Sequence, residues 1–199
     1  GSVWRVGDRF VLNFSESRDG VQAIFFAASR DLIHWRRLPD ELRSDPDPRW
    51  YDDTRTGRWD CIWGMRRPDG SMVGYLTARP WSRTSGLACE SVGKVESVDG
   101  LHWQAAEPPV IDWGEWPRMD VGEVGAIQQI AGRYYLLLGY SEAGLGNRHA
   151  CEEQGSRMGM YTFVSDSPDG PFRADTRAHR LLTSNTATKL MTYFARFYP

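Results

Sequence analysis

A segment that recurs three times at an even spacing restricts the folds open to this chain. The copies begin at Ser29, Ser97 and Ser165, and each step between them is 68 residues long. In each copy the serine leads into an aspartate-containing turn, an aromatic residue follows six or seven positions after the serine, and a short polar segment ends the copy. Self-similarity of this kind indicates one supersecondary unit that is repeated along the chain.

Each repeated unit reads as four short strands. A glycine turn at Gly7, Gly70 or Gly132 opens an apolar segment ahead of each copy. β-Branched and aromatic residues alternate with polar ones between Gly, Asp and Pro punctuation, which is typical of short antiparallel strands, and helical periodicity is nearly absent. Four-stranded units that repeat in this way predict an all-β fold, a β-propeller of four-stranded blades. A stack of β-sandwich hairpins is the alternative interpretation.

The unit boundaries predict a single, partial β-propeller domain over residues 1–199. Its parts are the remainder of a first blade (1–45), a second blade (46–110), a third blade (111–185) and the start of a fourth blade (186–199). We expect the first blade to lack most of its innermost strand, since few printed residues precede the turn at Gly7. A propeller needs at least about four blades, so the chain is interpreted as a segment of one.

The overall composition excludes several classes of partner. The net charge is −2 and no run of Lys or Arg is present, so we expect no nucleic acid partner. No apolar run approaches transmembrane length, so we expect no membrane partner. Cys61, Cys89 and Cys151 show no CxxC pairing and no metal-ligand spacing with histidine, which predicts free thiols, no metal and no cofactor. No signal peptide is recognisable, which leaves a cytoplasmic and a secreted protein both open, and assembly as a homo-oligomer is open too.

Three segments of the chain match motifs of a known group of enzymes. Residues 27–39, AASRDLIHWRRLP, and residues 165–172, SDSPDGPF, are similar to the motif at which the blades of these enzymes end. Residues 123–137, EVGAIQQIAGRYYLL, are similar to the strand that begins with their general-acid glutamate. The whole chain thus resembles the five-bladed β-propeller glycosidases, glycoside hydrolase families 32, 43 and 68. This resemblance implies a hydrolase, without a redox cofactor, that cleaves a β-fructofuranoside, an arabinofuranoside or a xyloside.

In these enzymes the first residues of each innermost strand face the substrate cleft. Glycoside hydrolysis typically uses two carboxylates that flank the scissile bond. Glu123 opens an apolar strand, where a carboxylate is costly unless it has a role, and it is the predicted general acid. Asp120, three residues earlier, is either the acid itself or a partner that tunes Glu123. The alternative interpretation of Glu123 is a glutamate in a surface loop.

Asp60 opens the innermost strand of the second unit. It precedes Gly70 by ten residues, close to the nine that separate Glu123 from Gly132. The resemblance implies that Asp60 stabilises the transition state or tunes the acid, because a fixed anion favours the positive charge that develops on the sugar. The alternative is a turn aspartate that accepts backbone N–H groups. By the same count, the nucleophile is expected two or three residues before Gly1, outside the printed sequence.

Aromatic side chains near these carboxylates are candidates for stacking on a sugar ring, with arginine supplying hydrogen bonds. The predicted substrate-binding residues are Trp4, Trp59, Trp63, Trp113, Trp116 and Arg58. The residues that recur with the repeat are predicted to be structural, namely Trp35, Trp103, His34 and His102. Asp52 and Asp53 are expected in a solvated loop.

Two other functions are compatible with such a fold, because one fold hosts many activities. A noncatalytic carbohydrate-binding or interaction propeller would keep the tryptophans without needing Asp60 or Glu123. A propeller glycoside phosphorylase would gather arginine and histidine in its cleft, and the adjacent pair Arg66 and Arg67 is the one sequence feature that favours it. The partner predicted for the leading interpretation is a carbohydrate substrate.

Overall fold

The computed structural model describes residues 1–81, 91–115, 122–140, 159–177, 179–183 and 195–197. The chain divides into two compact units, Gly1–Thr84 with Gly93–Pro108, and Ser85–Val92 with Pro109–Pro199. Apart from a three-residue 3₁₀ helix, η1 (Asp40–Leu42), all regular elements among these residues are strands. No helix in the described ranges has the length and apolar character needed to cross a membrane.

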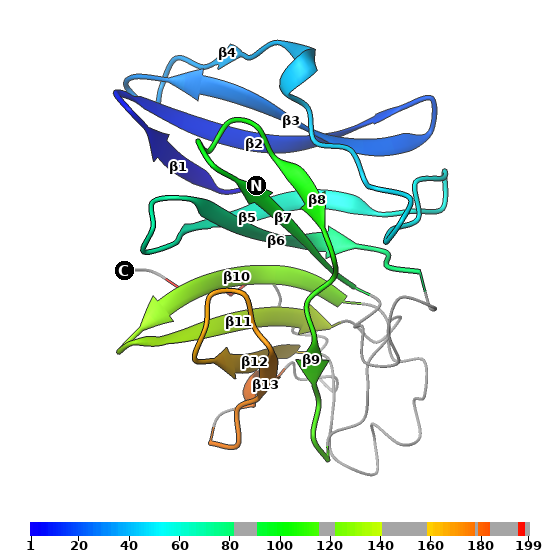
Figure 1. Ribbon diagram of the computed structural model, residues 1–199, viewed down its shortest axis with the longest axis vertical. Helices are drawn as coiled ribbons and strands as arrows, with labels where there is room; N and C mark the ends of the chain where they lie inside the picture. The colour runs from blue at the N-terminus through cyan, green and yellow to red at the C-terminus, as the bar shows by residue number, and fades with distance from the viewer. Residues whose placement is uncertain (82–90, 116–121, 141–158, 178, 184–194, 198–199) are drawn as a thin grey trace. The chain divides into compact units, whose positions relative to one another are not determined.

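The first unit contains two four-stranded antiparallel sheets (Figure 1). The first sheet has the order β1 (Val3–Val6), β2 (Arg9–Arg18), β3 (Val21–Ser29) and β4 (Arg36–Arg37). Innermost strand β1 pairs with only the first four residues of β2, in agreement with the short segment expected before the Gly7 turn. Gly7 makes that turn with a φ of +58°, in the left-handed region that glycine adopts without a steric penalty.

The second sheet repeats the same plan. Its order is β5 (Trp59–Arg66), β6 (Met72–Ala78), β7 (Val92–Ser97) and β8 (Gln104–Ala106). In both sheets the strands are ordered as they follow one another along the chain.

The core of the first unit contains large side chains from both of its sheets. Trp4 of β1 packs edge-to-face on Trp103 at a ring distance of 5.2 Å, and its Nε1 donates to the Gly100 carbonyl at 2.8 Å. Gly74 of β6 leaves room for the Trp103 ring, because a Cβ there would lie 3.0 Å from its Cζ3 and 2.5 Å from the Cγ2 of Ile62. The predicted structural role of Trp103 in packing one sheet on the next is therefore confirmed.

The sheet of the second unit has six strands. Its order is β10 (Gly122–Ile130), β11 (Arg133–Tyr140), β12 (Gly159–Ser165), β13 (Phe172–Ala174) and β9 (Ile111–Asp112), with β14 (Arg180–Thr183) also paired to β12. Short β13 covers only the end of β12, so β14 pairs with the rest of that strand. β9 then pairs in parallel with β13 at the edge. The range predicted as a fourth blade, 186–199, lies almost wholly outside the described residues.

The repeated exit motif forms the same hydrogen-bonded turn in the first two sheets. The Ser29 hydroxyl accepts the backbone N–H of Leu32 at 2.9 Å, and Asp31 accepts those of Ile33 and His34 at 2.9 and 2.8 Å. The His34 imidazole lies 2.8 Å from the Asp31 carboxylate. That imidazole and the backbone N–H groups of His34 and Ile33 lower the pKa of Asp31 below its usual range.

The second copy of this turn has matching geometry. Asp99 accepts the backbone N–H of His102 at 2.9 Å, and the His102 imidazole lies 2.7 Å from its second oxygen. Burial acts to raise the pKa of Asp99, but the hydrogen bonds from His102 outweigh burial and lower it. The prediction that both repeated histidines are structural is therefore confirmed.

Candidate active site

Asp60 lies in a strand and is held by side chains rather than by a turn. It is the second residue of β5 and pairs with Thr77. The Ser15 hydroxyl of β2 donates to Asp60 Oδ1 at 2.6 Å, and Arg58 Nη2 lies 3.7 Å from Asp60 Oδ2. The Asp60 side chain is 29% exposed, so a ligand can reach it.

The strand bulges directly after Asp60. Cys61 and Ile62 together oppose a single residue of β6, and Cys61 has a φ of +54°. A non-glycine residue in the left-handed region is uncommon, and bulges recur beside active sites because they redirect a side chain. Two β2 side chains hold the bulge: Ser15 accepts the Cys61 N–H at 3.1 Å, and Asn13 accepts the Ile62 N–H at 2.8 Å.

Glu123 occupies the matching position in the second unit. It is the second residue of β10, is partly buried and pairs with Gly139. The register of β10 shifts between Val124 and Ala126, so a bulge follows this carboxylate as well. Gly125 lies within that bulge, where a Cβ would come within 2.9 Å of the Met160 Cε.

Three of the tryptophans predicted to bind substrate lie in the core and not on an open surface. Trp59 is 1% exposed and packs on Tyr51 at a ring distance of 4.8 Å, and Trp4 is 8% exposed in the same core. Trp113 is also buried, 4.8 Å from the ring of Phe163. A sugar needs an open ring face, so the prediction that these three rings bind substrate is wrong.

Trp63, Arg58 and Trp116 remain predicted substrate-binding residues. Trp63, in the middle of β5, and Arg58, just before β5, are both partly buried. Asp120 and Trp116 lie outside the described residues.

Asp52 is a buried residue that the sequence analysis placed in a solvated loop. It is 4% exposed and accepts hydrogen bonds from the backbone and hydroxyl of Thr54 at 2.9 and 2.6 Å and from the Thr56 hydroxyl at 2.9 Å. Burial acts to raise the pKa of Asp52, but the bonds from Thr54 and Thr56 outweigh burial and lower it. The Asp-x-Thr-x-Thr spacing is the sequence signal for this turn, which shapes the loop leading into β5.

The arginine pair that favoured a phosphorylase is engaged in structural contacts. Arg66 donates to the carbonyls of Gly70 and Arg5 at 2.8 and 3.1 Å. Arg67 donates to the Glu96 carboxylate at 2.6 Å. These contacts account for the sequence feature without a phosphate ligand.

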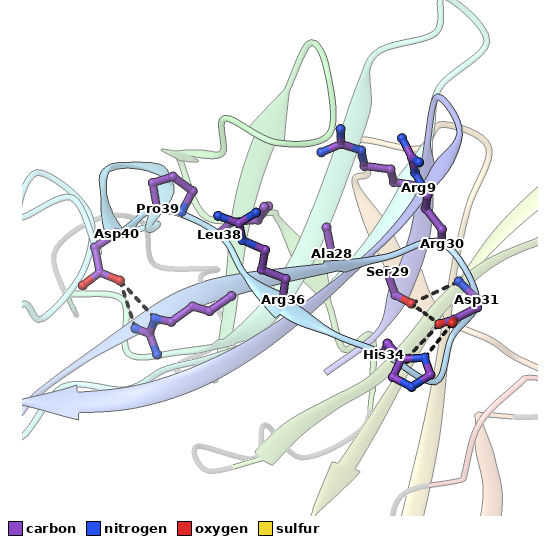
Figure 2. A pocket seen from close by; sticks show the side chains of 11 residues that line it. Arg9, Ala28, Ser29, Arg30, Asp31, His34, Arg36, Leu38, Pro39 and Asp40 are labelled. Carbon is purple, nitrogen blue, oxygen red and sulfur yellow. Dashed lines mark hydrogen bonds and ion pairs between the residues drawn. The ribbon is translucent and has the colours of Figure 1, made fainter.

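A hollow beside β4 and the first exit turn is rich in arginine, as Figure 2 shows. Arg9, Arg30 and Arg36 line it, together with two carboxylates. Both carboxylates are taken up by ion pairs, Asp31 with His34 and Asp40 with Arg37 and Arg18. The hollow therefore offers no carboxylate pair for acid/base chemistry, and Asp60 and Glu123 remain the predicted catalytic carboxylates of their respective units. In the described part of the chain, no three His, Cys, Asp or Glu side chains gather to hold a metal ion.

No protein-family model matches the sequence, and no curated protein matches it. Solved structures do share its fold. The GH43_1 enzyme from Xanthomonas citri, complexed with xylose, superposes with a TM-score of 0.55 at 19% identity, over 87% of this chain and 52% of that one. The α-L-arabinanase of Cellvibrio cellulosa, complexed with arabinohexaose, gives 0.52 at 15% identity, over 91% and 56%.

An α-L-arabinofuranosidase from Clostridium thermocellum gives a TM-score of 0.53 at 12% identity, over 87% of this chain and 49% of that one. The chain thus spans about half the length of these solved proteins. Together with the repeated four-stranded sheets, this likeness shows that the chain has the all-β fold of the β-propeller glycosidases, in the form of a segment.

Proposed function

We propose that this chain is part of a glycoside hydrolase that acts on arabinofuranosides or xylosides by carboxylate acid/base chemistry. One observation carries the proposal: Asp60 and Glu123 each stand second in the innermost strand of their own sheet, and a bulge follows each of them within two residues. The substrate class is suggested by the xylose and the arabinohexaose bound in two solved proteins of the same fold.

Each carboxylate takes a separate role in this proposal. Glu123 donates a proton to the leaving oxygen, and Asp120 either shares that task or tunes it. Asp60 remains a fixed anion that favours the oxocarbenium-like transition state. Arg58, Trp63 and Trp116 contact the sugar. The chemistry also requires a nucleophile or base on the other side of the scissile bond.

Turnover by the polypeptide that carries this chain tests the proposal. We expect release of nitrophenol from nitrophenyl α-L-arabinofuranoside or β-D-xyloside, and a fall of about 100-fold or more in kcat for Asp60→Asn. Glu123→Gln should slow cleavage of arabino- or xylo-oligosaccharides far more than cleavage of the nitrophenyl glycosides, because a good leaving group needs little protonation. Glu41→Gln, at an exposed position of η1, is the matched control and should leave both rates unchanged.

The same assay separates the other interpretations. Oligosaccharide binding without turnover, unchanged by Asp60→Asn and Glu123→Gln, would favour a noncatalytic carbohydrate-binding propeller. Turnover that requires inorganic phosphate would favour a phosphorylase. Cleavage of a β-fructofuranoside in place of the other two sugars would leave the acid/base roles standing and correct the substrate class.

A further inference from the structure

The inner face of β2 carries polar side chains where a sheet-to-sheet contact is usually apolar. Alternation along the strand places Val11, Asn13 and Ser15 on one side. Val11 and Asn13 are buried, and Ser15 is half-buried. Asn13 donates to the Ile62 carbonyl at 2.9 Å and to the Ser2 carbonyl at 3.0 Å, and it accepts the Ile62 N–H at 2.8 Å. Ser15 lies one step further along β2.

The Ser15 hydroxyl makes two short hydrogen bonds whose directions are fixed by chemistry, and it also lies 4.0 Å from Cys61 Sγ. The Cys61 N–H can only donate, so Ser15 Oγ accepts it, at 3.1 Å. The single hydroxyl hydrogen is then free to be donated to Asp60 Oδ1 at 2.6 Å, a short distance typical of a charge-assisted bond. One oxygen atom thus joins the candidate carboxylate to the bulge residue that follows it.

Cys61, whose N–H Ser15 accepts, has a backbone conformation that depends on its neighbours. Cys61 keeps a φ of +54°, and a non-glycine residue in this conformation persists only where its surroundings determine it. Asp60 Oδ2 lies 3.7 Å from Arg58 Nη2, beyond hydrogen-bond distance. The Cys61 thiol also contacts the carboxylate, since burial and a side-chain hydrogen bond with Asp60 raise the pKa of that thiol. Ser15 therefore fixes Oδ1 and does not occupy Oδ2.

We infer that Ser15 is a positioning residue that aims the Asp60 carboxylate at substrate and fixes the bulge at Cys61. The inference rests on the proposed function for the role of Asp60, but Ser15's hold on the bulge can be measured without turnover. Ser15 reaches Asp60 from a separate sheet, 45 residues away in sequence.

A double-mutant cycle on turnover tests the first part. Ser15→Ala should lower kcat by about tenfold, the equivalent of one hydrogen bond to a charged group, with little change in KM. Ser15→Thr keeps the hydroxyl and should restore most of the rate. If Ser15 acts through Asp60, the pair Ser15→Ala with Asp60→Asn should be no slower than Asp60→Asn alone. Losses that multiply in the double variant would overturn the inference.

Thiol labelling tests the second part independently of activity. In the folded protein, maleimide modification of the half-buried Cys61, located by peptide mass spectrometry, should accelerate several-fold in Ser15→Ala. Ser17→Ala changes an exposed serine on the same strand and should leave the rate unchanged. Equal labelling rates in the wild type and Ser15→Ala would overturn the hold on the bulge. If Asp60→Asn instead keeps full turnover while Ser15→Ala labels faster, the role proposed for Asp60 fails and the hold on the bulge stands.

Discussion

Replacing Asn13 with leucine should remove the polar link that joins β2 to the bulge of β5. Asn13 is fully buried, and its side chain bonds both the N–H and the carbonyl of Ile62, itself fully buried, and donates to the Ser2 carbonyl at 3.0 Å. Leucine has a similar size but leaves the Ile62 N–H without its partner, while the Ile62 carbonyl still accepts from the Ser2 hydroxyl at 2.7 Å. An unsatisfied buried group costs about 1–3 kcal/mol, so the one orphaned N–H predicts a loss of about 1–3 kcal/mol in the free energy of unfolding.

Urea denaturation followed by tryptophan fluorescence measures this loss, because Trp4 and Trp59 lie in the same core as Ile62. The midpoint should fall while the slope of free energy against urea stays constant. Ser17→Ala, on the exposed part of β2, should shift the free energy by less than about 0.5 kcal/mol. A loss below about 1 kcal/mol for Asn13→Leu would show that Ile62 finds other partners and would refute the reasoning.

Three further changes test packing inside a unit, two of them in the first unit and one in the second. Tyr51→Phe removes a hydroxyl that donates to the Ala106 carbonyl at 2.7 Å and accepts the Lys94 N–H at 2.9 Å, and should lower the unfolding free energy by about 1–3 kcal/mol in urea denaturation. Gly74→Ala places a Cβ 2.5 Å from an isoleucine methyl and should cost about 1–3 kcal/mol by overpacking, measured in the same way. Burial lowers the pKa of His179 from its usual 6.5, so below about pH 6.5 the unfolded chain takes up a proton that the folded one does not, and stability falls with falling pH. His179→Gln should flatten that part of a plot of melting temperature against pH, and an unchanged slope would contradict this account.

The repeating architecture was predictable because its signals are local. Turn glycines such as Gly7 and Gly132 have positive φ, and strand alternation between the turns needs no distant partner to be recognised. The Ser-x-Asp turn closes on itself within six residues, so its structural histidines were recognisable from their recurrence alone.

The wrong predictions concern tryptophans whose burial depends on contact with a second sheet. Trp4 and Trp59 stand at strand positions that look equally suited to a cleft, and only the packing of the two sheets against each other buries them. The left-handed Cys61 has no local signal either, since its hold comes from Ser15, 46 residues earlier. A usable signal did exist: Asn13 and Ser15 place polar groups on the face of β2 that Val11 marks as buried, and such groups require partners.

A bulge follows each of the two candidate carboxylates, and the two bulges are built in different ways. In β10 the bulge contains Gly125, where a side chain would collide with its surroundings, so glycine itself permits the irregular path. In β5 the bulge contains Cys61, which has a Cβ and a positive φ, and side chains of the neighbouring sheet hold it. A strained residue retained by a buried polar network is harder to maintain than a glycine. That the chain keeps this arrangement after Asp60 is best explained by a requirement on where the carboxylate points, which is the requirement that the Ser15 variants measure.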